Sequence, residues 1–371
     1  MDTVTQALFG AAVAQAGFRR SLGRPAILAG AVLGIVPDLD VAAGWFGPFT
    51  NWVHHRGITH SLLFAPVVGP LIGWGIWRLL RRTPAREGPA AAPDALWSWI
   101  WLSILVLVTH PVIDVFTSYG TQLLAPFSRH RFAVDAMPII DPVYSLALLA
   151  AVVFGAFSRR PRLAAALAAA SLFFVAGYTA LGWSVNERTE AIARAQLAGR
   201  AEHGFEVRAY PLLFQPWYRR VVATRPDEVL VGFHSILAPG EIGWRRFRND
   251  GADGAAAAVA ATPEGRIFRW FAMDQVHWTV VPAAEGAGEG SAEGGDEGGD
   301  EGGDEGGVAV EAMDLRYGMP GGTELGFWGI RARLDAAGRL AAPPEVHGRR
   351  PDAGRDAWAG FLRAVFRGPG T

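Results

Sequence analysis

Apolar segments of membrane-spanning length restrict the fold of this chain more than any other feature of its sequence. Four candidate spans lie at 61–80, 96–110, 138–157 and 163–183, the second only if it extends further at one end. A helix needs about 20 mostly apolar residues to cross a bilayer. Apolar residues make up 50% of the 371, and the mean hydropathy is positive at +0.19. Together these values are too apolar for an ordinary soluble protein. The sequence therefore predicts a mainly α polytopic membrane bundle.

Two shorter apolar segments, at 4–17 and 26–36, precede these four. At about 1.5 Å per residue each reaches only about 15–20 Å, which is short of a membrane span. Both are expected to be re-entrant or interior helices. Their Gly and Ala residues allow helix backbones to approach closely.

Arginine groups at 19–24, 78–86 and 159–162 predict the orientation of the segments, because loops rich in Arg stay on the cytoplasmic side. With the three groups placed there, the segments alternate across the membrane. The polar motifs described below then all lie on the opposite face, which predicts one shared site.

The chain changes character after Trp183. A polar helix is predicted at 185–204, and strands are predicted at 217–224, 228–236, 266–273, 276–281, 308–317 and 324–334. Residues 284–307 are Gly-rich acidic repeats that cannot form a core, and they predict a disordered insertion. The predicted domains are a membrane helical domain at 1–184 and a small β-rich soluble domain at 185–371, on the extracytoplasmic face.

Histidine and aspartate gather in three short motifs beside the apolar segments. The six predicted metal ligands are Asp38, Asp40, His55, His60, His110 and Asp114. The chain has no cysteine, so a transition-metal site must use His and carboxylate ligands. Such a mixture suits borderline metals, and zinc or manganese is the expected cofactor. The alternative is that these residues cap helices or mark a membrane boundary.

The spacing of His110 and Asp114 places both side chains on one face of a helix. Pro111 disfavours a helical residue before it and allows a break at His110. Three further residues, Arg56, Arg131 and Asp135, are candidate catalytic groups. An arginine would stabilise negative charge on a substrate, and an aspartate that is not a ligand would accept a proton from water. Structural salt bridges are the alternative.

Taken together, these motifs resemble the YdjM-type bacterial inner-membrane proteins, described as predicted membrane-bound metal-dependent hydrolases. The matching motifs are Met1-Asp2-Thr3-Val4-Thr5, Pro37-Asp38-Leu39-Asp40, His55-Arg56-Gly57, Thr59-His60, His110-Pro111, Asp114, Tyr119-Gly120, Pro126-Phe127-Ser128, Asp135 and Asp141-Pro142. The resemblance covers essentially the whole chain and is strongest over residues 1–145. It implies a multi-pass protein of the bacterial inner (cytoplasmic) membrane. Relatives carry His where this chain has Gln6, which is a poor zinc ligand.

The leading hypothesis is a membrane-bound metal-dependent hydrolase that activates water at an extracytoplasmic His/Asp site. Its expected partners are the lipid bilayer and a lipid or phosphoester substrate. The alternative is a non-catalytic membrane scaffold or sensor protein whose soluble domain binds a partner. The formal charge of −1 gives no indication of a nucleic-acid partner.

Overall fold

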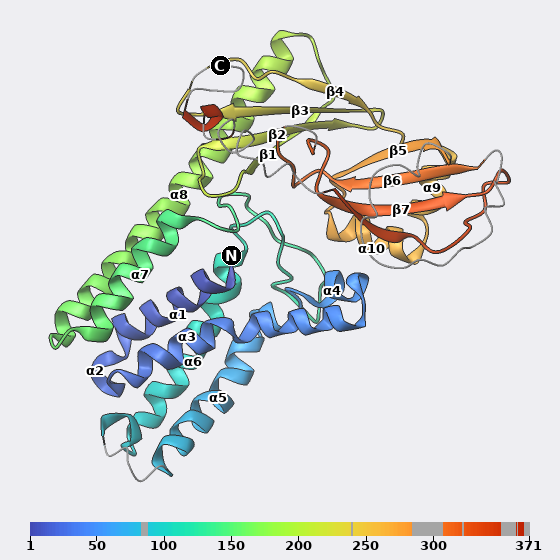
Figure 1. The fold of residues 1–371 in the computed structure, drawn as a ribbon. Coiled ribbons are helices and arrows are strands. Elements are labelled where there is room, and N and C mark those ends of the chain that lie inside the picture. Colours follow the sequence, from blue (N-terminus) through green and yellow to red (C-terminus); the bar gives the residue numbers. More distant parts are fainter. Residues whose placement is uncertain are drawn as a thin grey trace, which may run out of the picture. The chain divides into compact units, whose positions relative to one another are not determined.

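The computed structural model describes residues 1–82, 88–238, 240–283, 307–320, 323–349, 361 and 363–366. Over these residues a helical region comes first and two small antiparallel sheets follow (Figure 1), which confirms the predicted fold class. Contacts divide the chain into two units, Met1–Asn186 with Pro211–Pro216, and Glu187–Tyr210 with Trp217–Thr371. The insertion predicted at 284–307 lies outside the described residues, except for Gly307.

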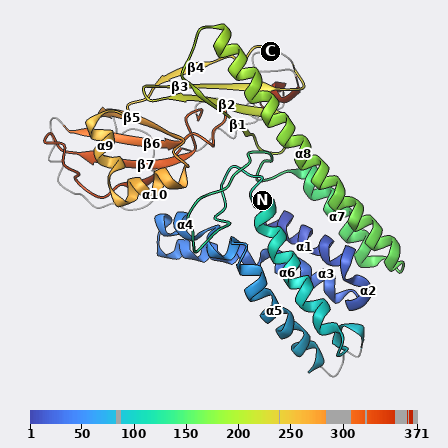
Figure 2. The same ribbon diagram turned by 180° about the vertical axis from the view of Figure 1, so that it is seen from behind.

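The helical unit combines long α-helices with short 3-10 helices, labelled η (Figures 1 and 2). In chain order they are α1 (Thr3–Gly17), α2 (Arg19–Leu22), α3 (Pro25–Ile35), η1 (Val36–Phe46), α4 (Pro48–His54), η2 (Ile58–His60), α5 (Phe64–Arg81), η3 (Pro89–Ala91), α6 (Ala95–Asp114), α7 (Pro142–Phe157) and α8 (Pro161–Gly199). The last part of α8 belongs to the second unit.

Among the described residues, three helical stretches are long and apolar enough to cross a membrane. They are Pro25–Phe46, Ala95–Asp114 and Pro161–Gly199. A bent pair, Pro48–His60 with Phe64–Arg81, gives a fourth if it counts as one span. A chain with several candidate spans is thus consistent with the predicted multi-pass bundle.

Two apolar segments differ in length from the prediction. The segment predicted at 26–36 does not stop there, because η1 continues from α3 and extends the apolar stretch to Phe46. The segment predicted at 138–157 is shorter, because α7 starts only at Pro142. The Asp141 carboxylate accepts a hydrogen bond from the Tyr144 N–H at 3.1 Å and thereby caps this helix.

Helix α6 does not break at His110, although Pro111 allowed that outcome. Pro111 lies in the last turn, and its fixed φ is compatible with a helix. It removes one backbone hydrogen bond and crowds the carbonyl four residues earlier, but the helix continues to Asp114. His110 and Asp114 consequently stay on one helical face.

Helices α1 and α3 touch backbone to backbone. A Cβ atom added at Gly30 would lie 2.4 Å from the Gly10 carbonyl oxygen, and one added at Gly34 would lie 2.4 Å from the Gln6 carbonyl oxygen. Only glycine allows this approach. The contact fixes the position of Gln6 on α1 and of the α3 end that leads into η1.

The second unit holds two four-stranded antiparallel sheets, each with its strands in sequence order. The first sheet contains β1 (Glu206–Pro211), β2 (Tyr218–Arg225), β3 (Glu228–Ser235) and β4 (Arg245–Arg248). The second contains β5 (Val276–Pro282), β6 (Val308–Asp314), β7 (Trp328–Leu334) and β8 (Glu345–Gly348). Two helices, α9 (Gly254–Ala260) and α10 (Pro263–Phe271), lie between the sheets in sequence.

The strand predicted at 266–273 is wrong, because this segment forms helix α10. Thr262 caps the helix by accepting a hydrogen bond from the Gly265 N–H at 2.9 Å, and Pro263 follows the cap. Phe268 and Phe271 are buried at a helical spacing of three. These start signals and this spacing outweigh the β propensity of the aromatic residues. Likewise, the polar helix predicted at 185–204 is the end of α8, because no turn signal separates the two.

A buried ion pair lies at the end of β6. The side chains of Asp314 and Arg316 are both fully buried, and Arg316 Nη2 lies 2.6 Å from Asp314 Oδ2. Arg220 of β2 donates hydrogen bonds to the backbone carbonyls of Leu315 and Glu324. Polar contacts therefore join the two sheets of this unit.

Candidate metal centre

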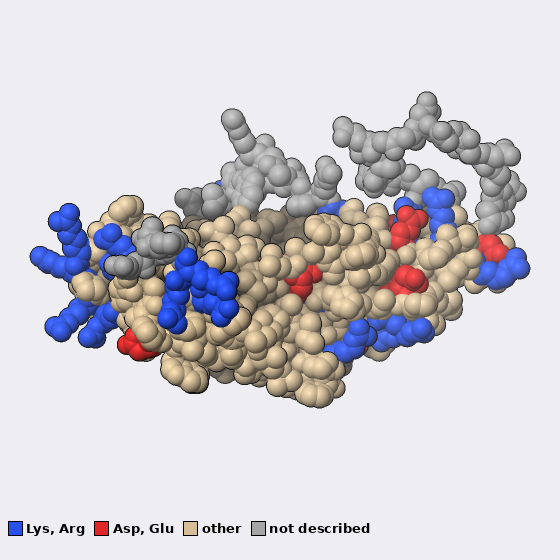
Figure 3. Space-filling model, turned by 90° about the horizontal axis from the view of Figure 1, so that it is seen from below, with Lys and Arg blue, Asp and Glu red and all other residues tan. Residues whose placement is uncertain are grey.

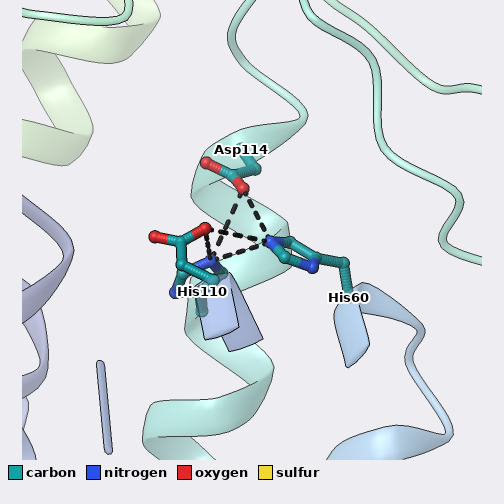
Figure 4. Close-up of side chains that lie close together, drawn as sticks. His60, His110 and Asp114 are labelled. Atoms are coloured by element: carbon teal, nitrogen blue, oxygen red, sulfur yellow. Dashed lines mark hydrogen bonds and ion pairs between the residues drawn. The ribbon is translucent and has the colours of Figure 1, made fainter. Parts of the chain in front are cut away.

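Four side chains from three elements come together in the helical unit. Asp38 comes from η1, His60 from η2, and His110 and Asp114 from the last turn of α6. One possible ligand atom of each lies within 4.8 Å of the other three. Figure 4 shows the two imidazoles and the Asp114 carboxylate pointing toward one another. These residues are called the four-residue group below.

Four of the five distances between ligand atoms match those around one small cation, and the fifth, between the two Nε2 atoms, is shorter. His60 Nε2 lies 3.0 Å from His110 Nε2, 3.5 Å from Asp38 Oδ1 and 3.4 Å from Asp114 Oδ2. His110 Nε2 lies 3.4 Å from Asp38 Oδ1 and 3.6 Å from Asp114 Oδ2. Zinc–ligand bonds of 2.0–2.2 Å in tetrahedral geometry separate neighbouring ligand atoms by about 3.3–3.6 Å. The group can therefore hold a metal ion.

Polar contacts at the Nδ1 atoms fix the orientation of both imidazole rings. His110 Nδ1 lies 2.7 Å from the Gly34 carbonyl oxygen, which can only accept a hydrogen bond. His60 Nδ1 lies 3.2 Å from Asp40 Oδ2 and 3.0 Å from the Thr59 hydroxyl, which itself donates to Asp40. An Nδ1–H donor leaves the Nε2 lone pair of a neutral histidine free to bind a metal.

Asp40 and His55, two of the six predicted ligands, lie outside the four-residue group. Asp40 Oδ1 is 2.7 Å from His55 Nδ1, and Asp40 Oδ2 accepts hydrogen bonds from the Arg56 N–H at 3.0 Å and the Thr59 hydroxyl at 2.6 Å. Arg56 has a positive φ of 60°. Asp40 therefore holds the turn that presents His60.

Asp114 is fully buried, and its two oxygens have different surroundings. Oδ1 accepts hydrogen bonds from the Met1 amino group and from Gln6 Nε2, the latter at 3.0 Å. Oδ2 faces the two imidazole Nε2 atoms and lies 3.3 Å from Arg56 Nε, but it accepts no hydrogen bond from any described residue. A buried carboxylate oxygen without a hydrogen bond is costly, so this atom fits a bound cation. Gln6 contacts the other oxygen, Oδ1, and is not a member of the four-residue group.

The three predicted catalytic residues occupy different positions. Arg56 lies beside the group, with Nε 3.3 Å from Asp114 Oδ2 and Nη1 2.9 Å from the Thr117 hydroxyl. Arg131 donates from Nη2 to the carbonyl oxygens of Tyr119 at 3.0 Å and Gly120 at 2.9 Å, which ties down the loop after α6. Asp135 is buried with a φ of 55°, and it is not a member of the four-residue group.

Among the groups that orient the two histidines, sequence reasoning named Asp40, as a candidate ligand, and missed the Gly34 carbonyl and the Thr59 hydroxyl. The Gly34 carbonyl has no side-chain signal, so no reading of residue types could find it. Thr59 directly precedes His60, and a hydroxyl beside a candidate ligand is a usable signal. Gln6 occupies a position where the resemblance implies a histidine ligand, whereas in the structure its Nε2 donates a hydrogen bond to Asp114.

Comparison with known proteins identifies the family of the helical region. A family model described as YdjM inner membrane protein matches residues 1–184. The uncharacterized protein YfhP of Bacillus subtilis (strain 168) is 32% identical over 119 residues, which cover 31% of this chain and 32% of that protein. The inner membrane protein YbcI of Escherichia coli (strain K12) is 35% identical over 109 residues, which cover 29% of this chain and 56% of that protein. No solved structure matches the chain. The helical region, residues 1–184, therefore matches the YdjM inner membrane protein family.

Proposed function

We propose that this protein is a membrane-bound metal-dependent hydrolase whose divalent ion is held by Asp38, His60, His110 and Asp114. The observation that carries the proposal is the set of five distances of 3.0–3.6 Å between the ligand atoms of two histidines and two aspartates. Zinc is the favoured ion, because these spacings suit short tetrahedral bonds to nitrogen and oxygen. A bound ion of this kind polarises a scissile group and lowers the pKa of water.

The protein residues have distinct roles in this proposal. Asp38 has 12% of its side chain exposed, whereas the other three side chains of the four-residue group are at most 1% exposed. Substrate would therefore approach past Asp38. Arg56 would hold the position of the Asp114 carboxylate through its guanidinium and add positive charge beside the reacting group. Asp40 would keep His60 in its binding orientation.

An amphiphilic substrate fits the surroundings of Asp38. Leu39, Trp45 and Phe46 follow Asp38 on η1, and they are 65%, 87% and 81% exposed. Large exposed apolar side chains of a membrane protein face lipid or an apolar ligand. A lipid carrying a phosphoester would place its polar group at Asp38 and its chains along these residues.

A test of the proposed function compares His60→Ala with His54→Ala in full-length protein purified in detergent. His54 belongs to the same motif, but its side chain is exposed and outside the four-residue group. Wild type and His54→Ala are expected to retain about one zinc or manganese ion per chain, to gain thermal stability when the ion is added, and to hydrolyse a lipid phosphoester. His60→Ala is expected to lose all three properties. Wild-type protein that neither retains a metal nor gains stability with zinc or manganese would contradict the proposal.

A second candidate function, a non-catalytic scaffold, has one observation in its favour. Four protein ligands fill a tetrahedral zinc site, and filled sites are usually structural. X-ray absorption at the metal edge separates the two candidates. A light-atom ligand in addition to the four protein ligands supports the hydrolase, whereas four protein ligands alone, with no turnover of any phosphoester, support the scaffold.

The role proposed for Asp40 predicts a graded effect on metal affinity. Asp40→Asn keeps the size of the side chain but weakens the contact with His60 Nδ1. Zinc affinity is expected to fall about 10–100-fold, as for other residues that orient a metal ligand. Competition with a chromophoric chelator measures this change, and Asp94→Asn, at an exposed position, is the control. An affinity within about twofold of wild type would contradict the role of Asp40.

We also propose that the C-terminal unit lies on the extracytoplasmic side, because the arginine groups should face the cytoplasm. The cysteine-free chain allows a direct test with single cysteines at exposed positions. In intact spheroplasts a membrane-impermeant maleimide is expected to label Ala337→Cys, and to label Ser21→Cys only after lysis. The reverse pattern would invert the topology.

A further inference from the structure

Six arginines gather at two turns of the helical unit. They are Arg19, Arg20, Arg24, Arg159, Arg160 and Arg162. The segments 3–35 and 142–186, which contain these turns and their helices, have no Asp or Glu. At the left end of Figure 3, where the α7–α8 turn of Figure 1 lies, basic side chains gather on the surface. Across the described part of the chain, no carboxylate forms an ion pair with any of the six.

Two of these arginines join the turns through one backbone carbonyl. Arg19 Nη2 donates to the Ser158 carbonyl oxygen at 2.6 Å, and Arg24 Nη2 donates to the same oxygen at 3.4 Å. Ser158 is the residue that ends α7. A single carbonyl has only a partial negative charge, so it cannot neutralise two guanidinium groups.

Arg19 lacks a partner for part of its guanidinium. The residue is only 6% exposed, and its Nη1 atom is buried without a hydrogen-bond acceptor among the described residues. Burial and the positive charge of Arg24 both lower the pKa of Arg19 below its ordinary value. A buried cation with an unsatisfied donor is costly. The partner that would offset this cost is an anion with several acceptor atoms.

We propose that Arg19 and Arg24 form a binding site for the phosphate of an anionic phospholipid. The site lies at the ends of apolar helices, where lipid headgroups are found, and the neighbouring exposed arginines add attraction for negative charge. A guanidinium binds phosphate oxygens in a bidentate way. Arg24 precedes α3 and Asp38 follows it, so the length of α3, about 16 Å, separates this site from the candidate metal centre. The proposal is therefore independent of hydrolysis.

The test measures lipid binding to full-length protein in a nonionic detergent by titration calorimetry. The probes are dihexanoyl phosphatidylglycerol, dihexanoyl phosphatidylcholine and inorganic phosphate. Wild type is expected to bind phosphatidylglycerol saturably and more tightly than either of the other two. Arg19→Met, which keeps much of the apolar stem, is expected to weaken this binding about fivefold or more. Arg82→Met removes the same charge at the exposed end of α5 and is expected to leave the affinity within about twofold.

Arg24→Met provides a second variant, because the Arg24 side chain is exposed and its loss leaves the buried packing intact. It is expected to weaken phosphatidylglycerol binding about fivefold, even where Arg19→Met does not fold. Unchanged binding by Arg24→Met would overturn the proposal, as would equal binding of phosphatidylcholine. Equal loss in Arg82→Met would mean general surface attraction instead of a site. Inorganic phosphate that binds as tightly as the lipid would overturn the assignment to a lipid.

Discussion

Gly30→Leu is expected to abolish metal binding, although position 30 touches none of the four candidate ligands. A side chain at position 30 would meet the Gly10 carbonyl oxygen and the Ala14 Cβ atom at 2.4 and 2.6 Å from its own Cβ. Backbone atoms cannot move aside as a flexible side chain can, so α1 and α3 must separate. The expected loss of stability is about 3 kcal/mol or more. Separation would also displace the Gly34 carbonyl from His110 and Gln6 from Asp114.

Thermal unfolding in detergent and zinc titration measure the two effects of Gly30→Leu. The matched control is Gly75→Leu, because Gly75 lies inside helix α5 and a Cβ atom there meets nothing within 4 Å. The control is expected to change stability by at most about 0.5 kcal/mol and to keep zinc affinity. Normal zinc affinity in folded Gly30→Leu would show that the α1–α3 contact does not position the candidate centre.

Asp314→Ala is expected to destabilise the second unit by about 3–5 kcal/mol, because it leaves the buried Arg316 guanidinium without its counter-ion. Trp328 Nε1 lies 3.3 Å from the same carboxylate and would lose that contact too. Hydrogen exchange of the full-length protein, followed on peptides from β6 and β7, measures the change. Faster exchange across both strands is the expected result.

The control for Asp314→Ala is an exposed ion pair of similar length. Arg200 Nη2 lies 2.7 Å from Glu241 Oε2, and the two side chains are 47% and 80% exposed. Glu241→Ala is expected to cost at most about 1 kcal/mol, because water screens exposed pairs. If the β6 and β7 peptides exchange hydrogen at the same rate in both variants, the buried Asp314–Arg316 pair does not stabilise the second unit by the expected amount.

Local patterns were enough to predict the helical bundle and most strands. The apolar segment around 96–110 reads as a helix from its residues alone, and the alternation in 228–236 reads as a strand. Helix α10 was missed because aromatic residues favour strands, while the cap at Thr262 lies outside the segment that suggested one. The start of the segment predicted at 138–157 was wrong for a similar reason, because the Asp141 cap sets where α7 begins.

The sequence predicted which residue types form the candidate centre, but it did not predict which individual residues belong to it. The sequence offered six His and Asp residues beside apolar segments, and nothing local separates Asp38 from Asp40. Only the fold places Asp38 against the two imidazole Nε2 atoms and Asp40 behind His60. Likewise, the sequence presents Arg56 and Arg131 as equals, whereas the fold places Arg56 Nε 3.3 Å from Asp114 Oδ2 and directs Arg131 Nη2 to the Tyr119 and Gly120 carbonyls.

Periodicity and composition act over a few neighbouring residues, so they are enough to specify an apolar helical region, a β-rich second region and the imidazole and carboxylate groups beside the helices. Which of these groups meet depends on how the helices pack. His110 and the Gly34 carbonyl are 76 residues apart, and His60 and His110 are 50 apart. Such pairs form only after helices pack at a separation set by glycines on facing backbones, and no local pattern encodes that separation.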